Sequence, residues 1–293
     1  MPVGSAPDWS TITREVHCPL CEYNLRGLVE PRCPECGHRF EWFAILNPSP
    51  IHPYLFEHHP RQKLWSFWRT ARGGLCPRRF WTQLKSVHAI SARRILGYWA
   101  LVMFLALAAL SGAILVLLGA FRYAANFWRV SRTKNHFSLS QLIAGRLAHT
   151  LIPMAALLAA LELAWPWLTL ASLMIFQISM RRRGVRNAHL LRCAFYCIDA
   201  ALWLNLCLLL AAGIAVFYGL ATHNLRTAAI LRPRTVPLCL FWSCLLLWLI
   251  ICYRLYVSYK NYLRFDHALA TIIASQVIVA LAIPTALVLL GLF

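Results

Sequence analysis

Five long apolar runs fill most of the chain after residue 96 and restrict its fold more than any other feature. They cover residues 97–119, 151–180, 195–221, 237–257 and 268–292. Each run has about 20 residues or more, the length that a helix needs to cross roughly 30 Å of hydrocarbon. The chain is 60% hydrophobic, well above the share of a soluble domain. We therefore expect an α-helical polytopic membrane protein with about five transmembrane helices in the cell membrane.

Charge is distributed unevenly between the two ends of the chain. Lys and Arg total 29 against 10 acidic residues, and only Glu162, Asp199 and Asp266 are acidic after Glu57. The basic residues form short runs between apolar segments, which is typical of membrane loops. This pattern indicates contact with the lipid bilayer, and no direct nucleic-acid binding is expected.

Loop charge also favours one orientation, because Lys and Arg collect on the cytoplasmic side. Nine basic residues lie between Arg61 and Arg94, before the first run. The second loop adds Arg181, Arg182, Arg183, Arg186 and Arg192. The first loop opposes this with Arg122, Arg129, Arg132, Lys134 and Arg146. The balance predicts a cytoplasmic N-terminus.

Two cysteine pairs precede the apolar region. Cys18 and Cys21 form one C-x2-C motif, and Cys33 and Cys36 form another after an eleven-residue spacer. Four thiolates at this spacing can surround a zinc ion at about 2.3 Å. Because all four positions would be filled by protein, the site is closed and structural rather than catalytic. We expect a small β zinc ribbon over residues 17–43, with Zn²⁺ as its cofactor.

Other states of these cysteines stay open at this point. Iron can also occupy a site made of four cysteines, and disulfides or free thiols are a further alternative. Residues 1–40 have no apolar stretch of the kind found in secretory signals, so a reducing compartment is expected, where thiolates are available for metal. His17 and His38 flank the pairs, and we expect them to face solvent. The apolar packing of the ribbon should come from Leu20, Tyr23, Leu25, Leu28, Phe40 and Trp42.

The segments around the ribbon have distinct compositions. We expect a flexible tail at 1–16, an extended linker at 44–63, a basic amphipathic interfacial segment at 64–96 and a transmembrane domain at 97–293. Pro77 is placed to start a helix with Phe80, Leu84, Val87 and Ile95 on one face. A basic helix with tryptophans commonly lies in the headgroup plane, although packing against the ribbon is the alternative. Pro166 predicts a kink or a break in the second run.

No acid or base is placed for an obvious reaction, so no catalytic residue is assigned. Glu162 lies inside the second run, where an ionisable group is costly and suggests a proton or cation path; a hydrogen-bonded Glu near a helix end is the alternative. We expect Asp199 to make a capping or pairing interaction rather than to form an active site, and we expect the same of Asp266. The stretch from His52 to Pro60 has three histidines without the spacing of a metalloprotease motif. We expect it to be an interfacial or domain-docking linker. Cys193 and Cys197 should simply pack in the apolar interior.

The cysteine-rich segment also has a family resemblance. Residues 17–40, HCPLCEYNLRGLVEPRCPECGHRF, resemble the N-terminal zinc ribbon of uncharacterised bacterial membrane proteins with a C-P-x-C-x-Y-x-L-R-G-L segment before C-P-E-C-G. The membrane part is loosely similar to the five-span Yip family, in its span count and in residues 242–283. This second resemblance implies a trafficking-like or scaffold role.

These features predict an integral membrane protein that is not an enzyme. The ribbon would dock an unknown protein partner in the cytoplasm, and the helices would anchor it and could form a homo-oligomer. A transporter-like bundle using Glu162 and a membrane enzyme regulated by the ribbon are the two alternatives.

Overall fold

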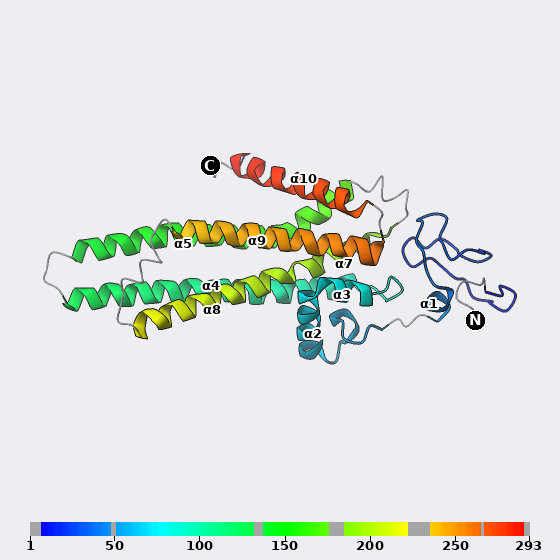
Figure 1. Ribbon diagram of the computed structural model, residues 1–293, viewed down its shortest axis with the longest axis horizontal. Coiled ribbons are helices and arrows are strands. Elements are labelled where there is room, and N and C mark those ends of the chain that lie inside the picture. Colours follow the sequence, from blue (N-terminus) through cyan, green and yellow to red (C-terminus); the bar gives the residue numbers. More distant parts are fainter. Residues whose placement is uncertain are drawn as a thin grey trace. The chain divides into compact units, whose positions relative to one another are not determined.

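The computed structural model describes residues 7–47, 51–131, 137–175, 185–221, 235–264 and 267–289. The described chain is mostly helical (Figure 1). Its helices are α1 (Trp42–Leu46), η1 (Phe56–His58), α2 (Lys63–Leu75), α3 (Pro77–Gln83), α4 (Ala92–Ser131), α5 (Phe137–Ile175), α7 (Asn187–Cys197), α8 (Asp199–Ala221), α9 (Thr235–Ser258), the π-helix η4 (Tyr259–Leu263) and α10 (Ala268–Leu289).

Four helical stretches are long and apolar enough to cross a membrane. They are Ala92–Ala120, Leu151–Met174, Asn187–Tyr218 and Phe241–Leu263. The expected fifth span falls on α10, where the apolar stretch counted in the described residues, Ala268–Ala282, is shorter. The membrane class is therefore confirmed, but the count of five is not. Residues 290–292 of that span, and the loop residues Arg132, Lys134, Arg181–Arg183 and Asp266, lie outside the described residues.

The chain divides into two compact units. The first contains Met1–Trp99, Trp165–Cys197 and Cys252–Phe293, and the second contains Ala100–Ala164 and Ile198–Ile251. The first unit thus combines the cysteine-rich segment with the ends of several apolar helices. Each unit is considered separately below.

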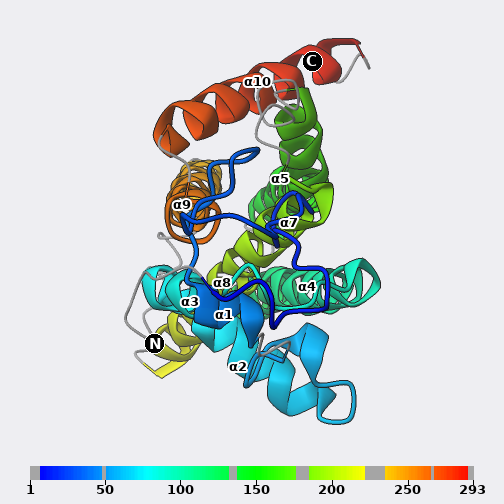
Figure 2. The ribbon, with the colours of Figure 1, turned by 90° about the vertical axis from the view of Figure 1, so that its right-hand side faces the viewer.

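The cysteine-rich segment has no regular strand among its described residues. It has only two isolated antiparallel bridges, His17 with Asn24 and Arg32 with Arg39. Figure 2 likewise draws this segment as loops ahead of α1. The expected β ribbon is therefore corrected to two turns, each closed by a single bridge. Few residues separate the bridged partners in each turn, so a longer ladder does not form.

The segment between the ribbon and the first span differs from the predicted pattern. Pro77 begins α3 as expected, but α3 ends at Gln83 and α4 begins only at Ala92, so Phe80 and Ile95 belong to different helices. The amide of Ser91 instead donates to the carboxylate of Glu57 at the start of α4. A carboxylate is favourable beside the exposed amides of a helix N-terminus, which favours a new helix at this point.

The expected linker also differs from the structure. Residues 52–59 include η1 and the buried residues His52, Leu55 and Glu57, so this stretch is packed rather than extended. Helix α5 is continuous through Pro166, so the second run has no break there, and the kink stays a prediction.

A chain of aromatic rings forms the core of the first unit. Tyr98 lies between Phe67 and Tyr196, with ring centroids 5.5 and 4.9 Å away. Phe80 continues the chain from Tyr196 to Trp81, at 5.9 and 5.2 Å. Offset and tilted aromatic pairs of this kind add stability beyond the area that they bury. The rings connect α2, α3, α4 and α7 on the side where the cysteine-rich segment docks.

Candidate metal centre and its contacts

The two cysteine pairs lie in turns with the same backbone hydrogen bonds. In the first turn the amide of Cys18 donates to the carbonyl of Tyr23, and the amide of Glu22 donates to the carbonyl of Cys18. We call this turn knuckle one. The pattern explains the C-x2-C spacing, because one tight turn holds both sulfur atoms on the same side.

The second turn, knuckle two, repeats this pattern fifteen residues later. Cys33 donates to His38, and Gly37 donates to Cys33, at 2.9 Å in both cases. The residue after each cysteine pair has a left-handed backbone, with φ of 63° at Glu22 and 69° at Gly37. Glycine adopts this conformation without cost, whereas glutamate does so against its preference. The two knuckles therefore have the same backbone conformation, but only knuckle two has a glycine at the left-handed position.

The four sulfur atoms are close enough to bind one metal ion. They all lie within 4.8 Å of one another. The sulfurs of Cys18 and Cys36 are 3.6 Å apart, and those of Cys21 and Cys33 are 3.5 Å apart. A tetrahedral zinc site with sulfur–metal bonds of about 2.3 Å needs sulfur–sulfur distances of about 3.8 Å. The donor set therefore fits a tetrahedral metal ion with little movement, and the four predicted ligands lie together.

The pKa values of these thiols also favour a metal ion among the four sulfur atoms. The hydrogen bond from Cys36 lowers the pKa of Cys18 to about 5, while burial raises the pKa of Cys21 to about 12. The same contact with Cys18 raises the pKa of Cys36. One thiolate thus forms easily, but its neighbours resist ionisation without a cation to compensate their charge. A metal ion provides that compensation.

The packing of the cysteine-rich segment confirms part of the predicted apolar set. Leu20, Leu25 and Trp42 are buried. Trp42 packs edge-on against Trp9 and Phe40, with centroids 5.2 and 4.9 Å apart. Trp9 also donates to the carbonyl of Leu28, so this part of the expected tail lies on the ribbon.

Two expectations about this segment were wrong. Tyr23 is exposed rather than part of the packing. His38 is buried rather than facing solvent, and its Nε2 lies 3.2 Å from the hydroxyl of Ser86. His17 does face solvent, as expected. The different fates of the two histidines follow from docking, because only His38 meets the loop before α4.

Knuckle one docks on the start of α7. The backbone amide of Arg186 donates to the carbonyl of Leu20, and Nε2 of His189 donates to the carbonyl of Pro19 at 2.9 Å. Both carbonyls belong to the two residues between Cys18 and Cys21. The guanidinium of Arg186 also pairs with Glu22 at 2.7 Å on the exposed rim. The metal-binding turn is thus part of the packed structure of the first unit.

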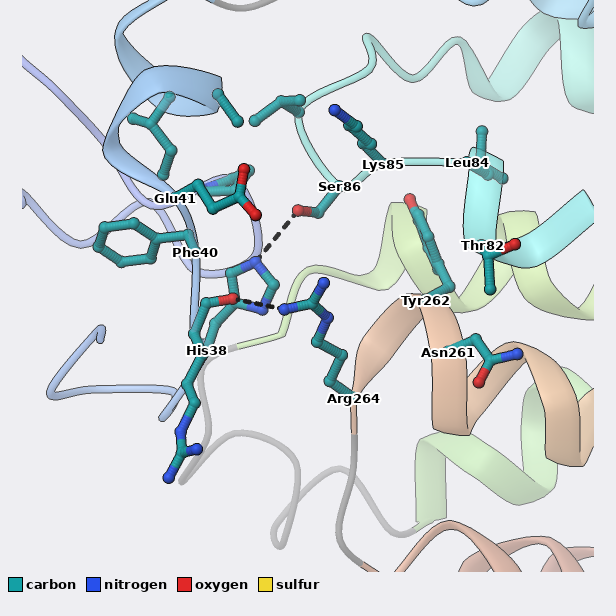
Figure 3. Close-up of a pocket in the computed structure, with 15 residues that line it drawn as sticks. His38, Phe40, Glu41, Thr82, Leu84, Lys85, Ser86, Asn261, Tyr262 and Arg264 are labelled. Carbon is teal, nitrogen blue, oxygen red and sulfur yellow. Dashed lines mark hydrogen bonds between the residues drawn. The ribbon is translucent and has the colours of Figure 1, made fainter. Parts of the chain in front are cut away.

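Knuckle two docks on two other parts of the same unit (Figure 3). Besides the His38–Ser86 contact, the guanidinium of Arg264 donates to the carbonyl of Arg39 at 3.1 Å. Arg264 directly follows the π-helix η4 and has a left-handed backbone, with φ of 57°. Both knuckles therefore contact the unit through the residues beside their cysteines.

A buried ion pair lies behind knuckle one. Nε of Arg192 donates to the carboxylate of Glu57 at 2.8 Å, and both side chains are fully buried. Arg192 also donates to the hydroxyl of Tyr262 and to the carbonyl of Ala89. Removing one partner of such a pair costs roughly 3–5 kcal/mol, because the other charge is left buried alone.

The ion pair and knuckle one are joined by hydrogen bonds. A carbonyl only accepts, so the hydrogen of His189 lies on Nε2, toward Pro19. Its Nδ1 then accepts from the hydroxyl of Tyr262 at 2.7 Å, and the same hydroxyl accepts from Arg192 at 2.9 Å. This chain, which we call the polar relay, runs from Glu57 to the carbonyl beside Cys18.

The histidines after residue 51 surround the ion pair instead of forming a second metal site. Burial lowers the pKa of both His52 and His88 to about 4, so these rings are neutral at physiological pH. Their ring centroids are 5.2 Å apart. His58 uses Nδ1 for the amide of His52 and Nε2 for the carbonyl of Ala89. Within the described residues, only the four cysteines form a group with metal-ligand spacing.

Glu162 lies in the second unit with a single polar side chain as partner. The amide nitrogen of Asn205 donates to both carboxylate oxygens of Glu162, at 3.1 and 3.0 Å, and to the carbonyl of Ala106. The amide oxygen of Asn205 is buried without a hydrogen-bond partner in the described chain. Asn205 thus links α4, α5 and α8, and Glu162 lies in the interior of this unit.

Sequence reasoning did not find the polar relay. In the sequence Arg192 is a loop charge, and no role is predicted for His189, Tyr262 or Glu57. The carboxylate partner of Arg192 in the structure is Glu57. The available signal was a His-x-x-Arg pair at the polar start of an apolar run, where ionisable groups commonly face other protein groups. Cys193 and Cys197 are buried, as expected.

No protein-family model, no curated protein and no solved structure matches this chain. The site must therefore be interpreted from its own geometry.

Proposed function

We propose that this protein is a non-enzymatic membrane scaffold whose zinc ribbon is held on the cytoplasmic ends of its own helices. The observation behind this proposal is the docking of both knuckles. Leu20 accepts a hydrogen bond from Arg186, just before α7, and Pro19 accepts one from His189 in α7. Arg39 accepts one from Arg264. A metal that fixes the turns also fixes these carbonyls. The ion would therefore organise a surface and would perform no reaction.

Zinc is the proposed metal because the donor set is closed and consists of four sulfur atoms. Zinc has no geometric preference of its own and accepts a tetrahedron of thiolates. Iron remains the rival, since it accepts the same ligands. Elemental analysis of the purified full-length chain distinguishes the two. One zinc per chain supports the proposal, whereas iron with a thiolate absorption band would redirect it toward electron transfer.

The surface proposed for a partner contains exposed apolar side chains of the ribbon. Tyr23 and Val29 are exposed, and Val29 is 75% accessible. A rigid turn with exposed apolar side chains suits protein docking. The resemblance to the Yip family also agrees with a scaffold or trafficking-like role. The proposed location is the cell membrane with the N-terminus in the reducing cytoplasm, where thiolates stay available for metal.

Hydrogen exchange on the full-length chain in lipid nanodiscs tests the scaffold proposal. We expect the amides of residues 16–40 and of residues 186–192 to be protected together with metal and to lose protection together after chelation. The amides of α8 in the second unit provide the internal control. If chelation opens only residues 16–40, the metal stabilises an independent module and the proposal fails.

Helix α2 adds a proposed contact with the membrane surface. Its buried side contains Phe67 and Ala71, while Trp65 and Trp68 are exposed and Arg69 stacks over Trp65 at 5.5 Å. No acidic residue occurs between Glu57 and Glu162. Tryptophans and arginines on one face match the headgroup region of an anionic leaflet. A photoreactive lipid should label α2 but not the exposed Phe43 of α1; equal labelling would contradict the assignment.

Transport through Glu162 is the second candidate. It is favoured by the unpartnered oxygen of Asn205 beside a buried carboxylate. Such a pair could hold a proton or a small cation inside the membrane. Glu162→Gln separates the alternatives in reconstituted vesicles. Loss of ion flux with normal unfolding temperature supports transport, while an unchanged flux assigns the pair to helix packing.

A further inference from the structure

A cavity of about 140 Å³ lies beside knuckle two within the first unit (Figure 3). We call it the knuckle cavity. Its walls come from the ribbon, from the start of α1, from the loop after α3 and from the end of η4. The lining includes Arg39, Glu41, Lys85, Ser86, Asn261 and Arg264. This volume is below the roughly 300–1,000 Å³ of sites for drug-sized ligands, so the cavity suits a small group.

The charged side chains around the knuckle cavity are mainly basic. Arg39, Lys85 and Arg264 contribute three positive charges against the single negative charge of Glu41. The ammonium of Lys85 makes no hydrogen bond or ion pair with the described residues, and Arg264 uses only one of its nitrogens, toward the carbonyl of Arg39. These cations therefore retain donors for a ligand.

Neutral groups add further hydrogen-bonding capacity. Nδ1 of the buried His38 has no partner in the described chain, while its Nε2 lies against the hydroxyl of Ser86. The side-chain amide of Asn261 makes no hydrogen bond with the described residues. A buried ring nitrogen without a partner costs free energy unless a ligand or water completes it. Figure 3 shows the hydroxyl of Ser86, the ring of His38 and the guanidinium of Arg264 beside one another, while the ammonium of Lys85 and the amide of Asn261 point away from them.

The position of the cavity indicates where its ligand comes from. Asn261 and Tyr262 belong to the last turn of the candidate span Phe241–Leu263, and Arg264 follows directly. The end of a span lies at the level of the lipid headgroups. Basic pockets at this level on the cytoplasmic side are suited to phosphorylated headgroups.

We propose that the knuckle cavity binds a phosphate ester, and that phospholipid headgroups of the surrounding membrane are its source. Arg264 would contact the phosphate oxygens, the exposed side chain of Lys85 would reach them by rotating toward the cavity, and Ser86 would supply a neutral donor. Charge-assisted hydrogen bonds to phosphate are short and strong, and guanidinium groups match its geometry. Glu41 would oppose the phosphate charge. A bound headgroup would connect the membrane surface directly to the metal-binding segment, which goes beyond the scaffold role.

Calorimetric titration of the purified full-length chain in non-ionic detergent tests this proposal. The probes are dihexanoyl-phosphatidylglycerol and glycerol phosphate, which share a phosphate ester but differ in the lipid part. We expect Lys85→Gln to weaken lipid binding roughly tenfold, the loss typical of one charge-assisted hydrogen bond. We expect Glu41→Gln to strengthen it. The control is Arg26→Gln, which also removes one exposed positive charge, from the ribbon spacer and outside the cavity lining.

Each outcome of these titrations supports or contradicts a phosphate site in the knuckle cavity. Binding of the lipid alone, weakened by Lys85→Gln and not by Arg26→Gln, supports the headgroup as the ligand. Equal binding of glycerol phosphate with the same dependence on Lys85 supports the phosphate site but assigns it to a soluble ester. Equal effects of Arg26→Gln and Lys85→Gln, or no binding of either probe, would overturn the proposal. Metal content is measured on every variant, so that a loss of the ribbon is distinguished from a loss of the cavity.

Discussion

Knuckle one and knuckle two have the same backbone and different surroundings. Each places its cysteines by the same pair of hydrogen bonds, and each has a left-handed residue after its second cysteine. Knuckle two has Gly37 there, whereas knuckle one has Glu22, which pairs with Arg186. Knuckle one is tied to the polar relay, while knuckle two borders the knuckle cavity. The comparison teaches that the C-x2-C spacing gives both turns the same backbone, and that docking determines the residues around it.

The largest effect should come from removing a ligand, and it should be the same in both knuckles. Cys18→Ser and Cys33→Ser each leave three thiolates, so metal content should fall from one ion per chain toward zero. Structural zinc contributes on the order of 10–16 kcal/mol to folding of small metal domains. Elemental analysis provides the measurement, with exposed Cys76→Ser as the matched control. A variant that keeps its metal would show that its knuckle is not part of the site.

The next effect should separate the two knuckles. His189→Leu removes the link from Pro19 to the polar relay and leaves the hydroxyl of Tyr262 with one partner fewer. We expect a loss of about 2–3 kcal/mol, because buried groups remain unsatisfied. Ser86→Ala removes the corresponding contact of His38 and should cost only about 1 kcal/mol.

Both docking variants can be followed by thermal unfolding and by the rate at which a chelator strips the metal. Substitution of the exposed His17 by Ala is the control, with no expected change. Faster stripping in Ser86→Ala than in His189→Leu would reverse the proposed roles of the two knuckles.

A smaller effect should follow from exchanging the left-handed residue of knuckle two. Gly37→Glu places a side chain at φ of 69°, which costs about 1–2 kcal/mol. Space is not the cause, since a Cβ at Gly37 would meet only the side chain of Arg32, at 3.8 Å. Chelator titration of the full-length chain should show weaker metal retention. Unchanged retention would mean that the backbone relaxes around the substitution.

The reverse exchange in knuckle one should have the smallest effect. Glu22→Gly relieves about 1 kcal/mol of backbone strain but removes the exposed pair with Arg186, worth roughly 0.2–1 kcal/mol. We expect a net gain between zero and about 1 kcal/mol in the same titration. Arg186→Ala isolates the ion-pair contribution, because it leaves the backbone of Glu22 unchanged. A net loss larger than that of Arg186→Ala would contradict the strain at Glu22.

The sequence alone predicted the cluster of four cysteines and the four apolar stretches that are long enough to cross a membrane. Both are local properties: a C-x2-C turn orients its own two sulfurs, and an apolar run of sufficient length has few alternatives in a membrane. The fifth predicted run falls on α10, of which Ala268–Ala282 is the apolar stretch counted in the described chain. The absence of regular strands in the ribbon was also missed, since cysteine spacing fixes turns but not the ladder between them.

The tertiary structure decided which polar residues meet. Glu57 and Arg192 are 135 positions apart, and His38 is buried by a loop 48 positions later. A polar side chain at a helix end looks the same in the sequence whether it faces water, headgroups or another polar group. Only the folded chain brings partners within hydrogen-bond distance, and burying a polar group without a partner costs free energy. For that reason the polar relay and the knuckle cavity became visible only in three dimensions.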